Sequence, residues 1–372
     1  MNLLINCSNL KKGGGLQVAN SICSQLYKYP QHRFLVVLSS ALEGTKKAID
    51  GISNIEIITY DIPNNFSTIL RGRDKMLDYI VKTKSIDAVL TVFGPSRWRP
   101  RVPHLCGFAR AQLVIKDSPY QQHLTLKEKF LYQIWSWLFR RSSNTFYTEN
   151  SYITQMLPNA LGKVKVYTVT NFYNQVFDKP DEWKRTLSLP PFDGVTLLSV
   201  TAAYPHKNLN IMLPVAEYIE KTYPDFQFRF VLTIDEGEFS PIPEQLKRHF
   251  VFLGRVDVAE CPYLYEQADI MFMPTLLECF TATYPEAMRM EIPIVTTDLE
   301  FARGLCGDAA CYYSAVDAET CAEAIYKVAM DEAYRLQLTA NGKEQLKKYD
   351  NYEQRAEKLI GILEGMVRQR QL

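Results

Sequence analysis

Two glutamates stand eight residues apart in the carboxyl-terminal half of the chain. Glu278 follows a short apolar run over residues 269–274, and Glu286 is expected about two turns into the next helix. Carboxylates accept hydrogen bonds from hydroxyl groups, and the N–H groups at a helix start can donate to an anion. This pattern predicts a site for an anionic or hydroxyl-rich ligand. The amides expected to take part are those of Phe280, Thr281 and Ala282.

A lysine at the start of another predicted helix adds positive charge to this chemistry. Lys207 follows a predicted strand over residues 194–201 and precedes a helix that runs to about Lys221. A cation and a helix N-terminus at one place act on the same phosphate oxygens. Lys207 is therefore expected to bind a diphosphate, although such a lysine taken alone is more often a solvated helix-start residue.

Strand and helix patterns alternate through both halves of the chain, which predicts two doubly wound α/β domains. Ligands of such sheets bind outside the carboxyl ends of the strands, and Glu278 lies in a loop of that kind. The predicted strands cover residues 1–7, 33–38, 54–59, 86–92, 194–201, 226–232, 249–254, 269–274 and 291–297. The predicted helices cover residues 16–29, 70–81, 126–141, 207–221, 262–267, 317–330, 332–348 and 352–368.

The segment Glu278-x7-Glu286, followed by Ala287, Met288 and Pro293, resembles the nucleotide-sugar site of glycosyltransferase family 4 (group 1). Members of that family are retaining enzymes with the GT-B fold, in which two Rossmann-like domains face a cleft. The resemblance implies that Glu278 contacts the donor sugar and Glu286 the ribose hydroxyls. It also implies that Lys207 and the loop amides hold the diphosphate.

The chain departs from the family pattern at two places. The family has an arginine five residues before the lysine, where this chain has Ala202. Its usual glycines in the glutamate loop are Cys279 and Thr281 here. The sequence does not show which residue replaces the arginine. The candidates are His206, Arg255 and Arg303.

The resemblance assigns further roles to residues outside this segment. Gly14 and Gly15 match a glycine-rich loop that faces the donor diphosphate and the acceptor. His104 matches a histidine near the donor sugar, and the segment from Val251 to Gly254 matches an edge whose backbone reads the nucleobase. Two plainer interpretations stay open. The glycines, which do not follow GxGxxG spacing, also fit a flexible turn, and a lone histidine is more often a satisfied core residue.

The domain boundaries follow from composition and from the resemblance. Residues 1–174 form the predicted acceptor-side domain, and residues 175–193 form a polar linker with three prolines. Residues 194–350 form the predicted nucleotide-sugar domain. Residues 351–372 form a final helix, which the family often returns to the first domain.

Charge is spread unevenly along the chain. The segment 67–141 holds 14 Lys or Arg against 5 Asp or Glu, a net of +9, while the whole chain carries +1. Its arginines include Arg97, Arg99 and Arg101 in an irregular stretch. The helix over 126–141 has aromatic residues flanked by bases, so it is either well buried or a membrane-surface element. We expect an anionic partner, either a lipid-linked acceptor or an anionic membrane surface, and not nucleic acid.

Composition supports a globular protein of 372 residues with 47% hydrophobic residues. No apolar run approaches the roughly 20 residues that cross a bilayer. The eight cysteines are scattered without metal-ligand spacing, and we expect buried, reduced thiols. No metal-binding cluster accompanies the site motifs, so no metal or other cofactor is expected. The predicted location is the cytoplasm, including the inner membrane surface.

The predicted function is transfer of a sugar, with retention, from a nucleoside-diphosphate sugar to a glycan or lipid-linked acceptor in polysaccharide or glycoconjugate synthesis. The enzyme is expected to be a hexosyltransferase that needs no metal. Two alternatives stay open. One is a sugar-nucleotide epimerase or hydrolase on the same fold, and the other is a glycan-binding relative without catalytic activity, which the alanine at position 202 suggests.

Overall fold

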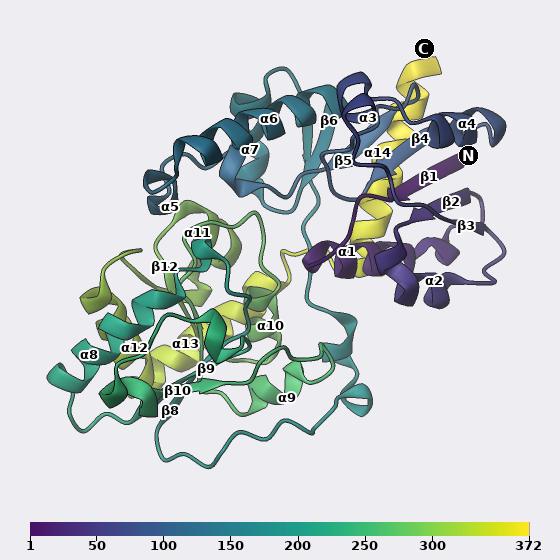
Figure 1. The fold of residues 1–372 in the computed structure, drawn as a ribbon. Helices are drawn as coiled ribbons and strands as arrows, with labels where there is room; N and C mark the ends of the chain where they lie inside the picture. The colour runs from purple at the N-terminus through teal and green to yellow at the C-terminus, as the bar shows by residue number, and fades with distance from the viewer. Residues whose placement is uncertain (372) are drawn as a thin grey trace. The chain divides into compact units, whose positions relative to one another are not determined.

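Two parallel sheets organise the chain, one in each of two structural units (Figure 1). The computed structural model describes residues 1–371, so Leu372 of the predicted final helix lies outside the described residues. Unit 1 comprises Met1–Lys116, Leu124–Asn171 and Asp350–Leu372, and unit 2 comprises Asp117–His123 and Phe172–Tyr349. The predicted fold, two doubly wound domains with the final helix returning to the first, is confirmed.

The sheet of unit 1 has seven strands in the order β3-β2-β1-β4-β5-β6-β7, all paired in parallel. The strand order reverses between β1 and β4, which are neighbours in the sheet. The strands are β1 (Asn2–Cys7), β2 (Arg33–Leu38), β3 (Ile55–Thr59), β4 (Ala88–Thr91), β5 (His104–Gly107), β6 (Thr145–Thr148) and β7 (Lys165–Thr168).

Helices cover both faces of this sheet because its central strands are apolar on both sides. Along β1, Leu3 and Ile5 belong to one hydrophobic cluster, while Leu4 between them belongs to another, as the two-residue period of a strand requires. The helices are α1 (Gly14–Cys23), α2 (Glu43–Ile49), α3 (Phe66–Arg71), α4 (Lys75–Thr83), α6 (Leu126–Ser142), α7 (Ser151–Leu161) and α14 (Tyr352–Gln371). Helix α14 packs on α1 and β4, which explains why the end of the chain belongs to unit 1.

The sheet of unit 2 has six parallel strands in the order β10-β9-β8-β11-β12-β13. Its order reverses between β8 and β11. The strands are β8 (Val195–Ser199), β9 (Phe228–Leu232), β10 (Phe250–Phe252), β11 (Ile270–Met273), β12 (Ile294–Thr297) and β13 (Ala310–Tyr313). The helices are α5 (Pro119–Gln122), α8 (Met212–Thr222), α9 (Cys261–Glu266), α10 (Thr283–Arg289), α11 (Glu300–Cys306), α12 (Ala318–Met330) and α13 (Glu332–Leu346).

The predicted strands all occur, with ends shifted by up to three residues, but three predicted helices were wrong in extent. The helix expected over 16–29 ends at Cys23 as α1 and is followed by the 3₁₀ turn Leu26–Lys28. The helix expected over 70–81 is two helices, because Gly72 takes a left-handed conformation that ends α3 and Asp74 caps the first turn of α4. The helix expected from Lys207 begins only at Met212, after two short 3₁₀ turns. The predicted buried thiols are confirmed, since all eight cysteines are free and buried.

Candidate active site

The site-bearing loops of unit 2 follow β8 and β11, the two strands between which the strand order reverses. In open parallel sheets this switch point is where ligands bind. Hydroxyl groups from the neighbouring strands fix the end of β11. Ser199 Oγ donates to the Phe272 carbonyl at 2.6 Å, and Thr297 Oγ1 donates to the Thr275 carbonyl at 2.7 Å. The loop that carries Glu278 therefore leaves the sheet in a defined direction.

Lys207 and Glu278, seventy-one residues apart in sequence, meet at this switch point. Lys207 Nζ lies 2.5 Å from Glu278 Oε1, and the two side chains are only 12% and 11% exposed. Lys207 ends the 3₁₀ turn Pro205–Lys207, and the next residue, Asn208, has a φ of 52°. The lysine thus stands before α8 rather than in its first turn, which corrects its predicted placement.

Thr275 completes this ion pair, and the sequence interpretation missed it. Its hydroxyl lies 2.9 Å from Glu278 Oε1 and 3.3 Å from the carbonyl oxygen of His206. The amide of Leu276 donates to the same carbonyl at 2.8 Å, so the two loops are joined by their backbones. Both side-chain contacts of Glu278 fall on Oε1, and among the described residues Oε2 has no partner.

The loop between Glu278 and α10 presents unpaired backbone amides. Helix α10 begins at Thr283 with Ala282 as its N-cap. Among the described residues, no partner accepts from the amides of Phe280, Thr281 and Ala282. Cys279 and Thr281 stand where the resembled family has glycines. Both residues are buried in this loop. The predicted set of free amides at this helix start is present.

Glu286 lies in the first turn of α10, not two turns into the helix as predicted, because the preceding loop extends to residue 282. The side chain is buried, and burial raises its pKa to about 7. The hydroxyl of Tyr265 donates to Glu286 Oε2 at 3.1 Å and opposes part of that rise. Nothing in the sequence around Tyr265 marked it as a partner of this carboxylate.

Residues Asp117–His123, placed by the sequence interpretation in the amino-terminal domain, belong to unit 2 beside this network. Ser118 Oγ donates to the Leu276 carbonyl at 2.6 Å. The ring of Tyr120 meets His206 edge-on at 5.9 Å, and Tyr204 stacks on His206 at 5.7 Å. Burial lowers the pKa of His206, and the charge of Lys207 lowers it further while Glu278 opposes the shift.

The predicted base-reading edge lies at the outer strand of this sheet. Val251 is in β10, and Gly254 follows it with a φ of 68°, a left-handed conformation that favours glycine. A Cβ at Gly254 would lie 2.8 Å from Asp235 Oδ1, so a side chain there would displace that carboxylate. The amide of Gly254 donates to the Ile234 carbonyl. The structure places these residues at a carboxyl edge, and their contact with a base stays a prediction.

Gly14 and Gly15 form the first two residues of α1 in unit 1, after β1. A Cβ at Gly14 would meet open space, while one at Gly15 would lie 3.3 Å from a methyl group of Leu10. Asn9 Nδ2 donates to the Phe93 carbonyl at 2.7 Å and so joins the ends of β1 and β4 at the switch point of this sheet. The glycines thus stand at a helix N-terminus at the expected edge.

His104 has the contacts of a core histidine. It begins β5, is 7% exposed, and has both ring nitrogens occupied, one 2.8 Å from Thr91 Oγ1 and one 3.0 Å from the Ser142 carbonyl. Burial lowers its pKa to about 4, so the ring is neutral at pH 7. This geometry gives no support to the predicted contact with a donor sugar.

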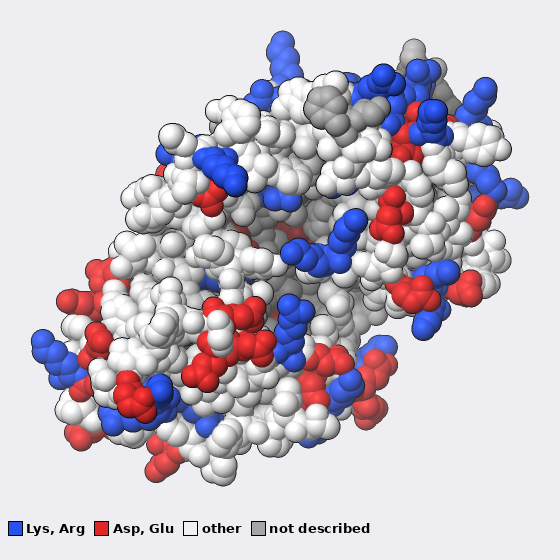
Figure 2. Space-filling view, viewed as in Figure 1, with Lys and Arg blue, Asp and Glu red and all other residues white. Residues whose placement is uncertain are grey.

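Helix α6 exposes an apolar stripe, which contradicts the interpretation of a well-buried helix. A capping box between Thr125 and Glu128 starts the helix. The Glu128 carboxylate, the one acidic side chain of α6, is thereby hydrogen-bonded to Thr125. The outward residues Leu126, Phe130 and Trp137 are 84%, 64% and 43% exposed. Figure 2 shows mainly uncharged surface over α6 with Lys and Arg groups beside it. The bases of the helix are Lys127, Lys129, Arg140 and Arg141.

The arginine stretch of unit 1 meets the end of this helix at Gly72. The Arg99 amide donates to the Gly72 carbonyl, and a Cβ at Gly72 would lie 3.0 Å from the Arg141 guanidinium. Arg99 and Arg101 are exposed, but Arg97 is half-buried and burial lowers its pKa. The basic surface therefore consists of Arg99, Arg101 and Arg141 rather than of three successive arginines of the stretch.

Two features of the described residues bear on metal ions and membranes. No group of three or more His, Cys, Asp or Glu side chains in residues 1–371 could hold a metal ion. No helix within the same residues is long and apolar enough to cross a membrane.

Comparison with known sequences gives a family match within unit 2 and a partial alignment with a relative. Residues 188–345 match the family model of glycosyl transferases group 1. The phosphatidyl-myo-inositol mannosyltransferase of Mycolicibacterium smegmatis is 30% identical over 149 residues. That alignment spans 39% of this chain and 39% of the length of the relative.

Comparison with solved structures covers nearly the whole chain. A glycosyltransferase from Rickettsia africae aligns with a TM-score of 0.68 at 14% identity and covers 98% of both chains. Anabaena HepE in complex with UDP and glucose aligns at 0.64 with 15% identity, over 98% of this chain and 99% of its own. Sucrose-phosphate synthase from Thermosynechococcus elongatus aligns at 0.67 with 12% identity, over 98% of both chains. These likenesses establish a shared two-sheet fold.

Proposed function

We propose that this chain, whose residues 188–345 match the family model of glycosyl transferases group 1, transfers a sugar from a nucleoside-diphosphate donor to a hydroxyl acceptor with retention. The observation that carries the proposal is the ion pair between Lys207 and Glu278 at the switch point of unit 2. Both groups stand beside unpaired amides at the start of α10. The site thus offers positive potential for a diphosphate next to a carboxylate for sugar hydroxyls.

In this proposal Lys207 stabilises the charge that develops on the leaving diphosphate. An ammonium group has three donors, so Lys207 can keep Glu278 as one partner and bind a phosphate oxygen with another. The amides of Phe280, Thr281 and Ala282 add fixed dipoles at the same place. Stabilisers held in position before the reaction need no reorganisation as charge builds up, which is why such groups lower the barrier effectively.

The two glutamates take different parts of the donor. Glu278 Oε1 is occupied by Lys207 and Thr275, which leaves Oε2 to accept from a hydroxyl of the sugar. Glu286 Oε2 accepts from Tyr265, which leaves Oε1 for the ribose. Each carboxylate is thus oriented by protein donors on one oxygen and open on the other. This division of roles is the one that the family resemblance implies.

A second cation for the diphosphate is most readily supplied by Arg255. Of the three candidates for the missing arginine, His206 has a lowered pKa and is neutral at pH 7, and Arg303 is engaged with Asp298 at 2.5 Å. Arg255 follows Gly254 at the carboxyl edge of the sheet and is exposed. Within residues 1–371 no side chain pairs with it. We assign the role to Arg255 for this reason.

The reaction then needs no base from the protein, since a donor phosphate oxygen can take the acceptor proton. It also needs no metal, because Lys207, Arg255 and the loop amides supply the positive potential. His104 has no part in this scheme, as both of its nitrogens are occupied in the core of unit 1. Gly14 and Gly15 keep their proposed place beside the diphosphate and acceptor through the first amides of α1.

The acceptor side is proposed to be an anionic lipid-linked glycan or an anionic membrane surface. The stripe of Leu126, Phe130, Ile134 and Trp137 follows spacings of four, four and three residues, which places these side chains along one line of α6. Bases flank that line, and Arg99 continues it at the end of the helix. An apolar stripe with aromatic residues and flanking bases is the pattern of helices that lie in a lipid interface.

The deciding experiment is a donor screen followed by product analysis. Thermal shifts with nucleoside diphosphates identify the base, because a ligand that binds only the folded state raises its stability. UDP-glucose and a mannose nucleotide are the first donors, given the HepE complex and the mannosyltransferase relative. Transfer with an unchanged anomeric configuration, read by NMR, supports the proposal. Hydrolysis or epimerisation of the donor without transfer supports the alternative enzyme, and binding without turnover supports a non-catalytic relative.

A further inference from the structure

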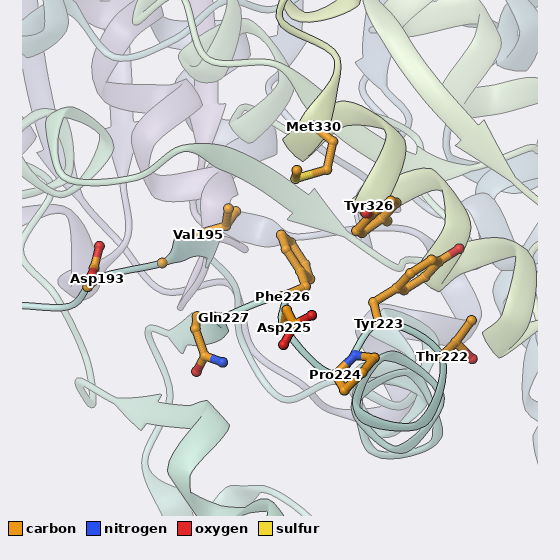
Figure 3. A pocket seen from close by; sticks show the side chains of 11 residues that line it. Asp193, Val195, Thr222, Tyr223, Pro224, Asp225, Phe226, Gln227, Tyr326 and Met330 are labelled. Atoms are coloured by element: carbon orange, nitrogen blue, oxygen red, sulfur yellow. The ribbon is translucent and has the colours of Figure 1, made fainter.

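A pocket in unit 2 lies apart from the proposed donor site. It has a volume of about 510 Å³ and is lined by the start of β8, the connection from α8 to β9, and the end of α12 (Figure 3). This volume falls in the range of pockets that bind small molecules. None of the residues assigned above lines it.

The pocket and the donor site lie at opposite edges of one parallel sheet. Gly194 and Gln227, which line the pocket, immediately precede β8 and β9. Lys207 and Glu278 come after the carboxyl ends of β8 and β11. Strands of a parallel sheet all point the same way, so residues before them and residues after them occupy different edges. A donor bound at the switch point therefore does not reach the pocket.

Three aromatic rings form one wall of the pocket. Tyr223 and Tyr326 stack with centroids 3.8 Å apart and planes 4° apart, and Phe226 meets Tyr326 edge-on at 5.3 Å. Phe226 also stacks at 5.9 Å on Phe228, a fully buried residue of β9. In Figure 3 the three rings lie side by side, with Met330 beyond them. The wall is thus anchored in the core and already formed without a ligand.

Polar groups without partners face the same space. Within the described residues the side chains of Asp193, Asp225 and Gln227 make no hydrogen bond or ion pair. The nearby Glu220, by contrast, is paired with Arg248 and His249. Figure 3 shows Gln227 and Asp193 on the side of the pocket away from the tyrosines. Hydrogen-bonding groups and an aromatic wall therefore border one cavity.

The lining excludes two classes of ligand. It contains no lysine or arginine, and its charged residues are Asp193 and Asp225, so a phosphate or nucleotide would meet repulsion. It does not form a cage for an organic cation either, because Tyr223 and Tyr326 are in contact face to face and leave no space between their rings. A neutral ligand with one apolar face and several hydroxyl groups fits both constraints.

We propose that this pocket is a carbohydrate-binding subsite that holds part of a glycan acceptor or product away from the reacting end. The C–H face of a sugar ring packs on an aromatic wall, and its hydroxyls donate to carboxylate and amide oxygens. The proposal rests on the function proposed above, because the glycan that the subsite would hold is the acceptor or product of the proposed transfer. It extends that function by naming a second point of contact with the polysaccharide.

The test uses the full chain and three trisaccharides as probes: maltotriose, cellotriose and mannotriose. Saturation-transfer NMR and fluorescence titration should show at least one of them binding with a dissociation constant on the order of 1 mM. Tyr326→Ala, which removes one ring of the aromatic wall, should weaken binding at least tenfold. A double variant, Asp225→Ala with Gln227→Ala, changes two exposed residues of the pocket lining and leaves the core unchanged. It should also weaken binding at least tenfold. Glu319→Ala, an exposed change elsewhere on α12, should have no effect.

The outcomes separate the subsite from the catalytic proposal. Circular dichroism checks the fold of Tyr326→Ala. If that protein does not fold, the double variant at Asp225 and Gln227 tests the subsite instead. Absence of binding by all three probes at about 1 mM, or binding that both variants leave unchanged, overturns the subsite even in an active transferase. Binding that depends on Tyr326 in a protein that transfers no sugar keeps the subsite and refutes the proposed function instead.

Discussion

The two units share a parallel sheet with a switch point, yet they carry opposite charge. Unit 1 holds 26 Lys or Arg against 13 Asp or Glu, a net of +13, and unit 2 holds 16 against 28, a net of −12. The unit that contains the match to glycosyl transferases group 1 is thus the acidic one. Net charge alone would have placed an anionic donor on the other unit.

This contrast teaches that an anion site depends on local arrangement rather than on total charge. Exposed charges are screened beyond about 10 Å in ordinary salt, while buried groups are screened much less. In unit 2 a largely buried lysine and unpaired amides lie at one edge of the sheet. In unit 1 the bases are spread over exposed surface, which suits attraction to an extended anionic partner.

A buried glutamate in each unit sharpens the comparison. Burial raises the pKa of both Glu149 in unit 1 and Glu286 in unit 2 to about 7. Glu286 has a hydroxyl donor in Tyr265, whereas Glu149 has only the charge of the buried Arg355 to offset its burial. Among the described residues Glu149 Oε1 has no hydrogen-bond partner. The carboxylate proposed to bind a ligand thus has a hydroxyl donor, whereas the carboxylate of Glu149 is influenced by the charge of a buried arginine.

The largest effect is expected at Lys207. Lys207→Ala should lower kcat by roughly 10²–10³, the scale of losing one preorganised stabiliser of developing charge. Folding should change little in an otherwise intact loop. Steady-state kinetics checks this against Lys221→Ala, a lysine at the end of α8. Wild-type turnover in Lys207→Ala would show that unit 2 does not use local charge as argued.

The two site glutamates should differ in what they lose. Removing either leaves donor hydroxyls unpaired, at a cost of about 1–3 kcal/mol. Glu278→Gln should mainly lower kcat and change sugar selectivity, while Glu286→Gln should mainly weaken binding of the free nucleoside diphosphate. Calorimetry with the free nucleotide is the measurement. Equal losses in the two variants contradict the division of roles.

The apolar stripe of α6 should bind anionic vesicles in a salt-sensitive way. Replacing Phe130 and Trp137 together by Ser should weaken binding roughly tenfold or more, because each exposed ring gives up apolar burial in the interface. The double variant Arg99→Ser with Arg101→Ser should weaken the salt-sensitive part of vesicle binding by about 1 kcal/mol for each base removed. Co-sedimentation at low and high salt measures both effects.

The matched control for this experiment lies on unit 2. Val316→Ser with Leu336→Ser removes two residues that are 62% and 64% exposed there, and it should leave vesicle binding unchanged. Equal binding to neutral and anionic vesicles, or no binding at low salt, removes the membrane and leaves an acceptor free in solution as the partner of unit 1. Nucleotide binding should stay intact in all of these variants.

The buried glutamates should make stability fall as pH rises. A carboxyl whose pKa is about 7 in the folded state and 4.5 otherwise binds its proton more tightly when folded. Its stabilising contribution is complete below about pH 4.5 and is lost as pH rises through about 7. Glu286→Gln should therefore raise stability at pH 8 by on the order of 1–2 kcal/mol. Glu149→Gln should raise stability at pH 8 by less, because Arg355 then loses the nearby negative charge.

Scanning calorimetry between pH 5 and pH 8 (roughly the window over which such a group loses its proton) measures this contrast. Glu357→Gln, an exposed change on α14, is the control and should not alter the pH dependence. A pH dependence that stays the same in Glu286→Gln shows that this carboxylate does not titrate near neutrality. Equal increases in stability at pH 8 in the two variants would show that the charge of Arg355 makes no difference to Glu149.

The smallest effect is expected from chelation. Since Lys207, Arg255 and the amides before α10 are proposed to supply the positive potential, activity should survive EDTA. Initial rates with and without chelator give the result. Complete loss that Mg²⁺ or Mn²⁺ restores would mean that local cations of unit 2 are insufficient and that the site was misread. Arg255→Ala should then have little effect on turnover, whereas the role proposed for Arg255 predicts that this change lowers it.

The sequence by itself determined the fold class and pointed to the location of the proposed donor site. Apolar runs of strand length, separated by helical periods, leave few arrangements other than parallel sheets. Glu278, Glu286 and Lys207 could be named because each lies just after a strand or at an expected helix start. These features are local in sequence, and local features are what spacing and propensity report.

Tertiary structure alone decided which groups meet and what state they take. Thr275 reaches the His206 carbonyl, Tyr265 reaches Glu286, and Ser118 reaches the Leu276 carbonyl only because the fold brings separate segments together. His104 looked like a site residue, but its two hydrogen bonds and burial make it part of a core. Burial also raises the pKa of Glu286 and leaves the stripe on α6 exposed. Burial and partners depend on packing between distant segments, which no spacing along a single chain encodes.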